Sequence, residues 1–507
     1  MKRLILSIGL ILLTLPSFSQ DVIADLFRAS YKVFELQRNS FGIYRDSKLF
    51  IGNDFHPSSV ANVGVGLMSL CIADSMGWIS NAEYLAEETL KSMSGNRPGF
   101  TPDRNATGFY RHFIEMNTGN QAWNSEYSTI DSGIFLCGAL FAKKYFNNNT
   151  TIESYVEQIY NTMDWSKVIA DVQQGRLYMI MNANGNGQSN ASLPPFNEYM
   201  IVAWLAMKAE QNNPGDATQL WNLHFEHADS LLTKTYQGIP VLTDSPNSYI
   251  PSFTLQFPYY MCHHFTTQTD YLQYFEQARR ADSLWFATVT NYNSYEWGLG
   301  AGSYNTGSGY HADEINDNPS QIVSPHIIAG FIPIYPQAEQ DLIDLYNNNK
   351  GKFTLPNSSA PNQILWRYSN TVPSWSASEV QGIDYSTMLF GLASLPQFLG
   401  KDFFAYYNDY DFPPYSTSTI TIESNHNLTI YPNPVQDELN LKIEGVYQGK
   451  LQLRILDIEG KLLQILEVMK NESTTHYLIP FQEWTSGVYF VEVLGDDGQR
   501  LVKKVVK

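Results

Sequence analysis

The sequence predicts an all-α body, built as a six-hairpin (α/α)6 toroid, followed by a small all-β sandwich. Three observations support this fold class. Six helix candidates that are apolar almost all round alternate with amphipathic candidates that have a single apolar stripe. The connections that lead into the apolar candidates are long. Near residue 413 the helical period changes to the two-residue alternation that is typical of strands.

The apolar candidates are expected to form an inner ring, because a helix that is apolar on every side must be covered on every side. They begin near Ser58, Ser128, Phe196, Phe257, Ile322 and Asp384. The amphipathic candidates are expected to form the outer layer. They span residues 81–94, 151–163, 217–233, 269–288 and 336–347, and an N-terminal helix over 22–36 supplies the sixth outer partner.

The long connections point to the location of a site. Those that enter inner helices span residues 96–126, 180–195, 292–321 and 350–382, and they are rich in Gly, Asn, Tyr and Trp. Loops of this length inside a compact domain are usually functional. Since the inner helices should run parallel, these loops open at the same end of the ring, and we expect the functional site there.

The domain order is read from composition. Residues 1–20 have the charged end, apolar core and small-residue cleavage site of a secretory signal peptide. The helical body is expected over 21–412, a Pro/Ser/Thr-rich linker over 413–425 and the β-sandwich over 426–507. No later apolar run approaches the 18 residues of a membrane span, so no transmembrane segment is expected.

Charge and composition narrow the class of partner. The net charge of −18 excludes nucleic acid and anionic membranes as binding partners, since both require basic patches. Aromatic residues make up 14% of the chain, which suits stacking on carbohydrate as well as a large core. Cys71, Cys137 and Cys262 each lie in an apolar run and are interpreted as buried small side chains, with one disulfide left open.

The tail carries specific motifs. It begins with Tyr-Pro-Asn-Pro at residues 431–434, continues with ILDIEGKLL, and ends with SGVYFVEV and KKVVK. These motifs resemble the type A C-terminal sorting domain of the type IX secretion system. The resemblance implies export through the periplasm and across the outer membrane by that machinery, followed by release or attachment at the cell surface. The alternative is a generic carbohydrate-binding or immunoglobulin-like module.

The body resembles the glucoamylase-like (glycoamylase) domain family, which includes bacterial endo-β-1,2-glucanases. The matching stretches are residues 108–113, 123–140, 196–199, 257–264, 297–302, 324–331 and 381–389. The resemblance implies an (α/α)6 toroid and an inverting glycoside hydrolase. The chain also departs from the family pattern: Tyr385-Ser386 follows Ile383-Asp384 where Gln-Gly-Pro is common, and residues 303–309 replace an acidic stretch.

Two carboxylates are the candidate catalytic groups, because glycoside hydrolysis requires an acid and a base. Glu198 lies among Pro195, Phe196 and Tyr199, surroundings that should raise its pKa, and the resemblance places the general acid there. Asp384 begins another inner helix, and the general base of the family corresponds to it. The structural alternative for both residues is helix capping.

Further residues are candidate substrate contacts. Glu126 and Asp131 are interpreted as binding or network carboxylates, and Ser128-x-x-Asp131 is also a capping signal. His311 lies in a loop and is expected to touch sugar. The stacking candidates are Tyr110, Trp123, Trp297, Tyr304, Tyr310 and Trp375.

No metal or other cofactor is expected. His263-His264 with Asp270 hints at a metal, but adjacent helical histidines point to opposite sides and no third ligand is suitably spaced. The sequence therefore predicts an exported hydrolase of a glucan, most of all a β-1,2-linked one. The alternatives are a hydrolase of another glucan or oligosaccharide on the same fold, and a non-catalytic glycan-binding protein at the cell surface.

Overall fold

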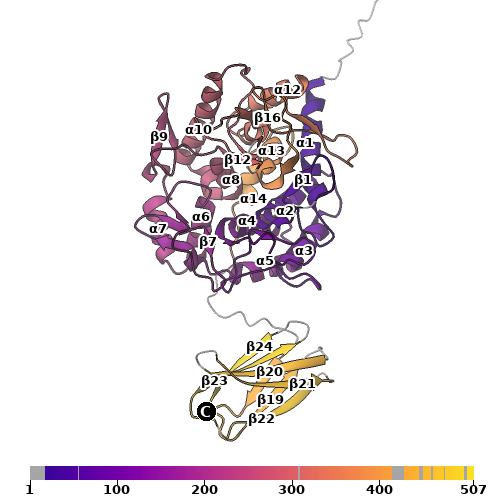
Figure 1. The fold of residues 1–507 in the computed structure, drawn as a ribbon, viewed down its shortest axis with the longest axis vertical. Coiled ribbons are helices and arrows are strands. Elements are labelled where there is room, and N and C mark those ends of the chain that lie inside the picture. Colours follow the sequence, from indigo (N-terminus) through magenta and orange to yellow (C-terminus); the bar gives the residue numbers. More distant parts are fainter. Residues whose placement is uncertain are drawn as a thin grey trace, which may run out of the picture. The chain divides into compact units, whose positions relative to one another are not determined.

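A computed structural model of the 507-residue chain describes residues 18–54, 56–305, 309–413, 427–444, 449–457, 461–472, 474–482, 484–495 and 500–507. The chain divides into two compact units, one up to Thr417 and one from Ser418 (Figure 1). Most of the predicted signal peptide, residues 1–17, lies outside the described residues. The predicted linker does so as well, apart from its first residue.

Six helices of the first unit form a closed ring of contacts: each contacts the next, and the last returns to the first. They are α2 (Val60–Ser75), α4 (Thr129–Tyr145), α6 (Met200–Ala209), α8 (Phe253–Met261), α11 (Pro325–Gly330) and α13 (Gly382–Ala393). In Figure 1, α4, α8 and α13 surround the middle of this unit. The burial explains the sequence pattern: in α2 every residue from Val60 to Ala73 is buried.

The amphipathic helices lie outside this ring, near the rim in Figure 1. They are α1 (Phe18–Gln37), α3 (Ala82–Met93), α5 (Thr150–Asn161), α7 (Asp216–His224), α10 (Thr269–Ala287) and α12 (Ala338–Asn347). Two short helices, α9 (His263–Thr267) and α14 (Asp402–Tyr407), and single 3-10 turns at Trp165–Val168 and Ala228–Ser230 complete the set among the described residues. The six expected outer helices are therefore present, five of them close to their expected bounds.

One of the expected helices is much shorter than predicted. The sequence pattern favoured a helix over 217–233, but α7 ends at His224 and Thr233 begins β9. Gln237 and Gly238 adopt positive φ in the turn that pairs β9 with β10, so this stretch forms a hairpin. Asp270 accepts a hydrogen bond from the backbone N–H of Ala228 and holds the chain where it leaves the helix.

The prediction of an all-α body holds for the ring but not for its loops, which carry short strands. They are β1 (Ser47–Leu49), β2 (Ser58–Ser59), β3 (Phe113–Ile114), β4 (Tyr127–Ser128), β5 (Ile169–Asp171), β6 (Arg176–Tyr178), β7 (Ile180–Met181), β8 (Ser192–Leu193), β9 (Thr233–Tyr236), β10 (Ile239–Leu242), β11 (Ala301–Ser303), β12 (Tyr310–Ala312), β13 (Ile322–Val323), β14 (Lys352–Thr354), β15 (Gln363–Leu365), β16 (Tyr368–Ser369) and β17 (Glu379–Gln381). Some of these strands form local hairpins, whereas the antiparallel pairs β1–β17, β2–β3, β4–β7 and β13–β16 join segments far apart in the sequence. Each of these four pairs includes the strand that precedes an inner helix.

The inner helices α2 and α4 pack closely, and glycine makes this approach possible. A Cβ atom on Gly138 would overlap the carbonyl oxygen of Gly64, and one on Gly64 would overlap the backbone of Ile134 and Phe135. Both obstacles are backbone atoms, which cannot rotate away. These two glycines therefore set the spacing of the two helices that carry Ser59 and Asp131 at their N-terminal ends.

We predict that Gly138→Ala destabilises the protein by about 1–3 kcal/mol, the usual result of overpacking a core. Gly133→Ala in the same helix is the matched control, because its Cβ would meet side chains of α6 at an ordinary 3.5 Å. That variant should keep or raise Tm, since alanine favours helix by about 1 kcal/mol over glycine. Thermal unfolding of both variants measures the difference, and equal Tm values would contradict the close approach of α2 and α4.

The second unit consists of two antiparallel sheets around one core, as the alternation predicted. Its strands are β18 (Asn427–Tyr431), β19 (Glu438–Glu444), β20 (Gly449–Asp457), β21 (Leu462–Lys470), β22 (Thr474–Pro480), β23 (Val488–Gly495) and β24 (Arg500–Val506). The sheet orders are β18-β19-β22 and β21-β20-β23-β24. Leu439, Leu453 and Val491 from both sheets are fully buried in the shared core.

Two further expectations concern the whole chain. Across the described residues, no helix has the length and apolarity needed to pass through a membrane. Cys71, Cys137 and Cys262 are all buried and unbonded to one another, which agrees with their interpretation as small core side chains.

Candidate active site

Three acidic residues come from the N-terminal ends of inner helices. Asp131 and Asp384 lie in the first turns of α4 and α13, and Glu198 comes just before α6. Ser59 ends the loop before α2 and lies 3.4 Å from a carboxylate oxygen of Asp131, so the starts of α2 and α4 are adjacent. The parallel arrangement expected for the inner helices thus brings their first turns together at one end of the ring.

Glu198 is partly buried between Phe196 and Tyr199, both of which are buried. Burial raises its pKa to about 7, and the negative charges of Asp244 and Asp131 act in the same direction, while a backbone hydrogen bond opposes them. A carboxyl group with this pKa retains its proton on about half of the molecules at neutral pH. Glu198 therefore has the protonation behaviour of a general acid.

Asp384 is buried, with 3% of its surface exposed. Burial raises its pKa to about 7; the Arg367 charge opposes this rise, and the Asp46 charge adds to it. The hydroxyl of Tyr310 donates toward both carboxylate oxygens, at 3.3 and 3.4 Å, and stabilises the ionised form. Asp384 can thus ionise near neutral pH although it is buried.

Asp131 belongs to a hydrogen-bonded network at the start of α4. Ser128 caps the helix by accepting from the backbone N–H of Asp131, which confirms the capping prediction, and its hydroxyl also bonds the Asp131 carboxylate. His112 Nδ1 lies 3.3 Å from Glu126 Oε1 and 3.6 Å from Asp131 Oδ2. Burial alone would lower the pKa of His112, but these two carboxylates, with Asp46, raise it to about 9. His112 is therefore an imidazolium at neutral pH.

A second histidine site, which sequence reasoning missed, lies on the β1–β17 side. His56 Nε2 is 2.7 Å from Glu379 Oε2, and both groups are near Asp46. The pairing of Ser47 with Gln381 brings Asp46 next to the start of α13. No local motif marks Asp46 or His56, because only the pairing of strands from the two ends of the body places them at the site.

The hairpin of β11 and β12 supplies a third group of residues. His311 Nδ1 lies 2.9 Å from Asp313 Oδ1, and its ring stacks on Tyr304 at 4.7 Å. Asp313 also forms a 2.9 Å ion pair with Arg367, and neither of these side chains is exposed. Next to them, burial raises the pKa of Glu314 to about 7, and the charges of Asp317 and Asp244 add to the rise.

Electrostatic interactions connect these groups in one network. Asp244 acts on both Glu198 and Glu314, Asp131 acts on both Glu198 and His112, and Asp46 acts on both His112 and Asp384. Tyr310 and Arg367 connect Asp384 to the His311 hairpin. The segments that precede all six inner helices therefore contribute to one acidic region that contains both candidate catalytic carboxylates.

Several predicted aromatic residues present surface near this region. Trp123 is 55% exposed and is held at a φ of 53°, with its ring at 5.0 Å from Phe113 and at 5.3 Å from His56. Tyr310 is 47% exposed while its hydroxyl meets Asp384. Trp375 is partly exposed in the loop that leads into β17. An exposed ring with a fixed backbone is suited to stacking on a sugar.

Two predicted stacking residues are core residues instead. Tyr110 is fully buried, and its hydroxyl donates to the carbonyl of Met93. Trp297 is 1% exposed and donates from Nε1 to Asp341 at 3.0 Å. A ring that the protein covers on both faces has no surface for a sugar, and the sequence could not distinguish these rings from exposed ones.

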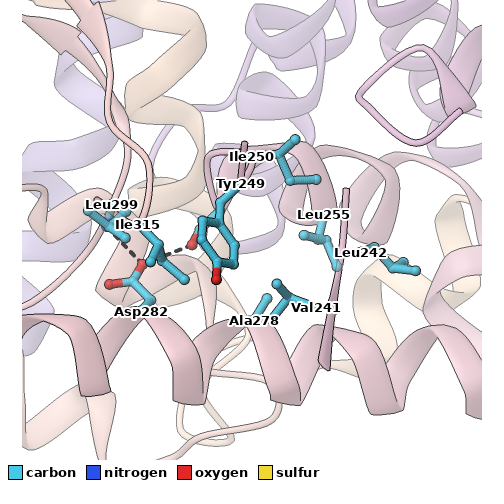
Figure 2. Close-up of a pocket in the computed structure, with 10 residues that line it drawn as sticks. Val241, Leu242, Tyr249, Ile250, Leu255, Ala278, Asp282, Leu299 and Ile315 are labelled. Carbon is cyan, nitrogen blue, oxygen red and sulfur yellow. Dashed lines mark hydrogen bonds between the residues drawn. The ribbon is translucent and has the colours of Figure 1, made fainter. Parts of the chain in front are cut away.

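Two cavities lined by described residues contain no candidate catalytic carboxylate. One of about 610 Å³ lies beside α10 and includes Trp297 in its lining. The other, of about 20 Å³, lies between α10 and β10 and holds Asp282 at one side (Figure 2). Asp282 accepts hydrogen bonds from the backbone N–H groups of Gly298 and Leu299, and so fixes the chain just before β11. The smaller cavity has room for about one water and not for a sugar.

The described residues contain no group of three or more His, Cys, Asp or Glu side chains placed to hold a metal ion. The histidine pair considered from the sequence is bound to backbone: His263 to the carbonyl of Ala405 and His264 to that of Glu226.

The two units of the chain are similar to different known proteins. Residues 429–507 match the family described as the secretion system C-terminal sorting domain. The tail is a sorting domain. It indicates that the protein is exported, and it confirms the resemblance inferred from the tail motifs. Among proteins of curated function, none matches this chain.

The body is similar in fold to several solved structures. An endo-β-1,2-glucanase from Chitinophaga pinensis, solved with sophorotriose and glucose, superposes with a TM-score of 0.60 at 16% identity, over 78% of this chain and 99% of that one. A provisionally named glucoamylase from Bacteroides uniformis gives 0.63 at 15% identity, over 77% and 94%. An endo-β-1,2-glucanase from Talaromyces funiculosus, solved with sophorose, gives 0.54 at 12% identity, over 76% and 87%. At sequence identities this low, the similarity shows that the body shares the fold of these proteins.

Proposed function

We propose that this protein is an exported glycoside hydrolase that cleaves a glucan, with β-1,2-linked glucan as the first candidate. The observation that carries the proposal is the pair Glu198 and Asp384. Each stands at the start of an inner helix, and each has a pKa near 7 because its surroundings desolvate the carboxylate. The shared fold with two endo-β-1,2-glucanases supports the choice of substrate.

The proposed reaction uses the two carboxyl groups in opposite protonation states. Protonated Glu198 gives its proton to the glycosidic oxygen as the bond to the anomeric carbon breaks. Ionised Asp384 takes a proton from the water that attacks this carbon, and the hydroxyl of Tyr310 holds the carboxylate in place. The cycle ends with Glu198 ionised and Asp384 protonated, and exchange with solvent restores both.

We propose an inverting course, which the resemblance to the glucoamylase-like family implies. Inversion requires the two carboxyl groups to lie about 6.5–9.5 Å apart, which leaves room for the attacking water.

The remaining groups of the region support binding of a neutral glycan. Glu126 has a lowered pKa because His112 donates a hydrogen bond to it, so it is an ionised acceptor for sugar hydroxyls. Trp123 offers a ring face near it. With Asp46, Asp131 and Glu379 also present, a glycan that carries carboxylate or sulfate groups would be repelled.

The tail supports a place of action outside the cell. We propose that the type IX secretion machinery recognises residues 426–507 and that the body acts as a released or surface-attached enzyme. The leader expected over residues 1–20 would direct the chain to the periplasm first.

The test is to incubate the purified protein with β-1,2-, β-1,3-, α-1,4- and α-1,6-glucans and to analyse the products. We expect hydrolysis of one of them, with β-1,2-glucan cut fastest. An NMR spectrum taken early in the reaction should show the opposite anomer from that of the cleaved bond. Binding without turnover on every glucan would instead support the glycan-binding alternative.

A further inference from the structure

Arg367 is a fully buried arginine beside the candidate base, and it has four partners. Its Nε donates to the carbonyl oxygen of Ser303 at 2.9 Å, and its Nη1 donates to Ser324 Oγ at 3.1 Å. Its Nη2 lies 3.5 Å from the carbonyl of His311 and 2.9 Å from the Asp313 carboxylate. A buried charge is costly to desolvate, and it is retained here with all of these partners in place.

Three of these partners belong to the hairpin that carries Tyr310. Ser303 is the residue of β11 that pairs with Tyr310 of β12, and His311 and Asp313 follow directly along the chain. The same hairpin end places the Tyr310 hydroxyl 3.3 Å and 3.4 Å from the two carboxylate oxygens of Asp384. Arg367 therefore fixes the segment whose hydroxyl contacts the candidate base.

The charges around Asp384 give Arg367 a second role. Three groups from separate segments face this carboxylate: Asp46 before β1, Tyr310 on β12 and Arg367 after β15. Asp46 contributes a negative charge when its carboxyl group is ionised, and the Tyr310 hydroxyl contributes no net charge. Among the groups with the largest effects on the pKa of Asp384, the cation is Arg367. Asp313, equally buried, partly neutralises it from the other side.

We propose that Arg367 is a positioning residue for Asp384. It clamps the β11–β12 hairpin so that Tyr310 donates to the carboxylate, and it supplies a fixed positive charge that Asp313 limits. The assignment of Asp384 as the base, and with it the catalytic meaning of this arrangement, rests on the proposed function.

The test compares two variants whose effects have opposite sign. Arg367→Met removes the cation, so Asp384 holds its proton to higher pH and the acid limb of the pH profile of kcat should rise by about 1 unit or more. Asp313→Asn leaves the arginine charge uncompensated, so the acid limb should fall by at least about 0.5 unit. The alkaline limb, which reports Glu198, should stay in place in both variants.

Asp282→Asn is the matched control. Asp282 supports the same hairpin through Gly298 and Leu299, but it is not among the charges that shift the pKa of Asp384. This variant should lower Tm and leave both limbs in place. Should Arg367→Met fail to fold, Arg367→Lys replaces it. The lysine keeps the charge but loses the fork that binds Ser303 and Ser324, so kcat should fall with little movement of the acid limb.

A readout that needs no turnover separates this proposal from the proposed function. The full-length protein, labelled with 13C at aspartate carboxyl carbons, gives the titration of Asp384 directly, with Asp384→Asn identifying its signal. Opposite shifts in the two variants support the proposal even if no glucan is cleaved. The proposal is wrong if Tm falls in both variants while the acid limb and the titration of the Asp384 carboxyl carbon stay in place. That conclusion holds even if a glucan is cleaved.

Discussion

Replacing Glu198 with glutamine is expected to reduce kcat on the best glucan by about 10²–10⁴-fold, the usual loss when a general acid is removed. Glutamine has nearly the same shape but holds no transferable proton. Since Glu198 is held in place by burial rather than by an ion pair, the fold and Tm should change little. Steady-state kinetics together with thermal unfolding measure both quantities.

The pH profile gives this prediction its control. With both pKa values near 7, about a quarter of the wild-type molecules at pH 7 have Glu198 protonated and Asp384 ionised, so activity should follow a narrow bell. Activity should fall above pH 7 as Glu198 loses its proton, and below pH 7 as Asp384 gains one. The residual activity of Glu198→Gln should lack the alkaline limb. A variant that keeps more than a tenth of wild-type turnover would show that Glu198 is not the acid.

Asp384→Asn should reduce kcat by a similar factor of about 10²–10⁴, because asparagine cannot take a proton from the attacking water. The Tyr310 hydroxyl can still donate to the amide oxygen, so the local structure should be kept. Product anomers and kcat measured on the same glucan test the assignment. A rate loss that added azide restores, as an external anion, would further support a base role.

Glu126→Gln is the comparison that distinguishes chemistry from binding. Glu126 is only partly buried and pairs with His112, so its loss should raise KM and change kcat less than either catalytic variant. If Glu126→Gln lowered kcat as strongly as Asp384→Asn, the base would have to be reassigned to the His112 network, which includes Asp131.

The alternation of apolar and amphipathic stretches was enough to predict both helical layers and the strands of the tail. Side-chain periodicity is a local property: a helix covered on all sides, like α2, must be apolar throughout, and a half-covered strand must alternate. The resemblance to the glucoamylase-like family marked Glu198 and Asp384, and their places at helix starts were consistent with either catalysis or capping. The capping role of Ser128 could be predicted because it depends on residues next to one another in the sequence.

Other parts of the candidate site depend on contacts between distant segments. Asp46 reaches Asp384 only because β1 pairs with β17, and Arg367 acts on the hairpin that carries Tyr310 only because the tertiary structure brings Ser303 against it. The sequence could not show which aromatic rings are covered, since the exposure of Trp123 and the burial of Trp297 depend on neighbours far along the chain. The sequence by itself determined the two helical layers, apart from the end of α7, and the strands of the tail, and it placed the two carboxylates at helix starts. Closure of the ring decided which other charges face these carboxylates, because electrostatic interactions depend on separation in space, and only the tertiary structure sets that separation.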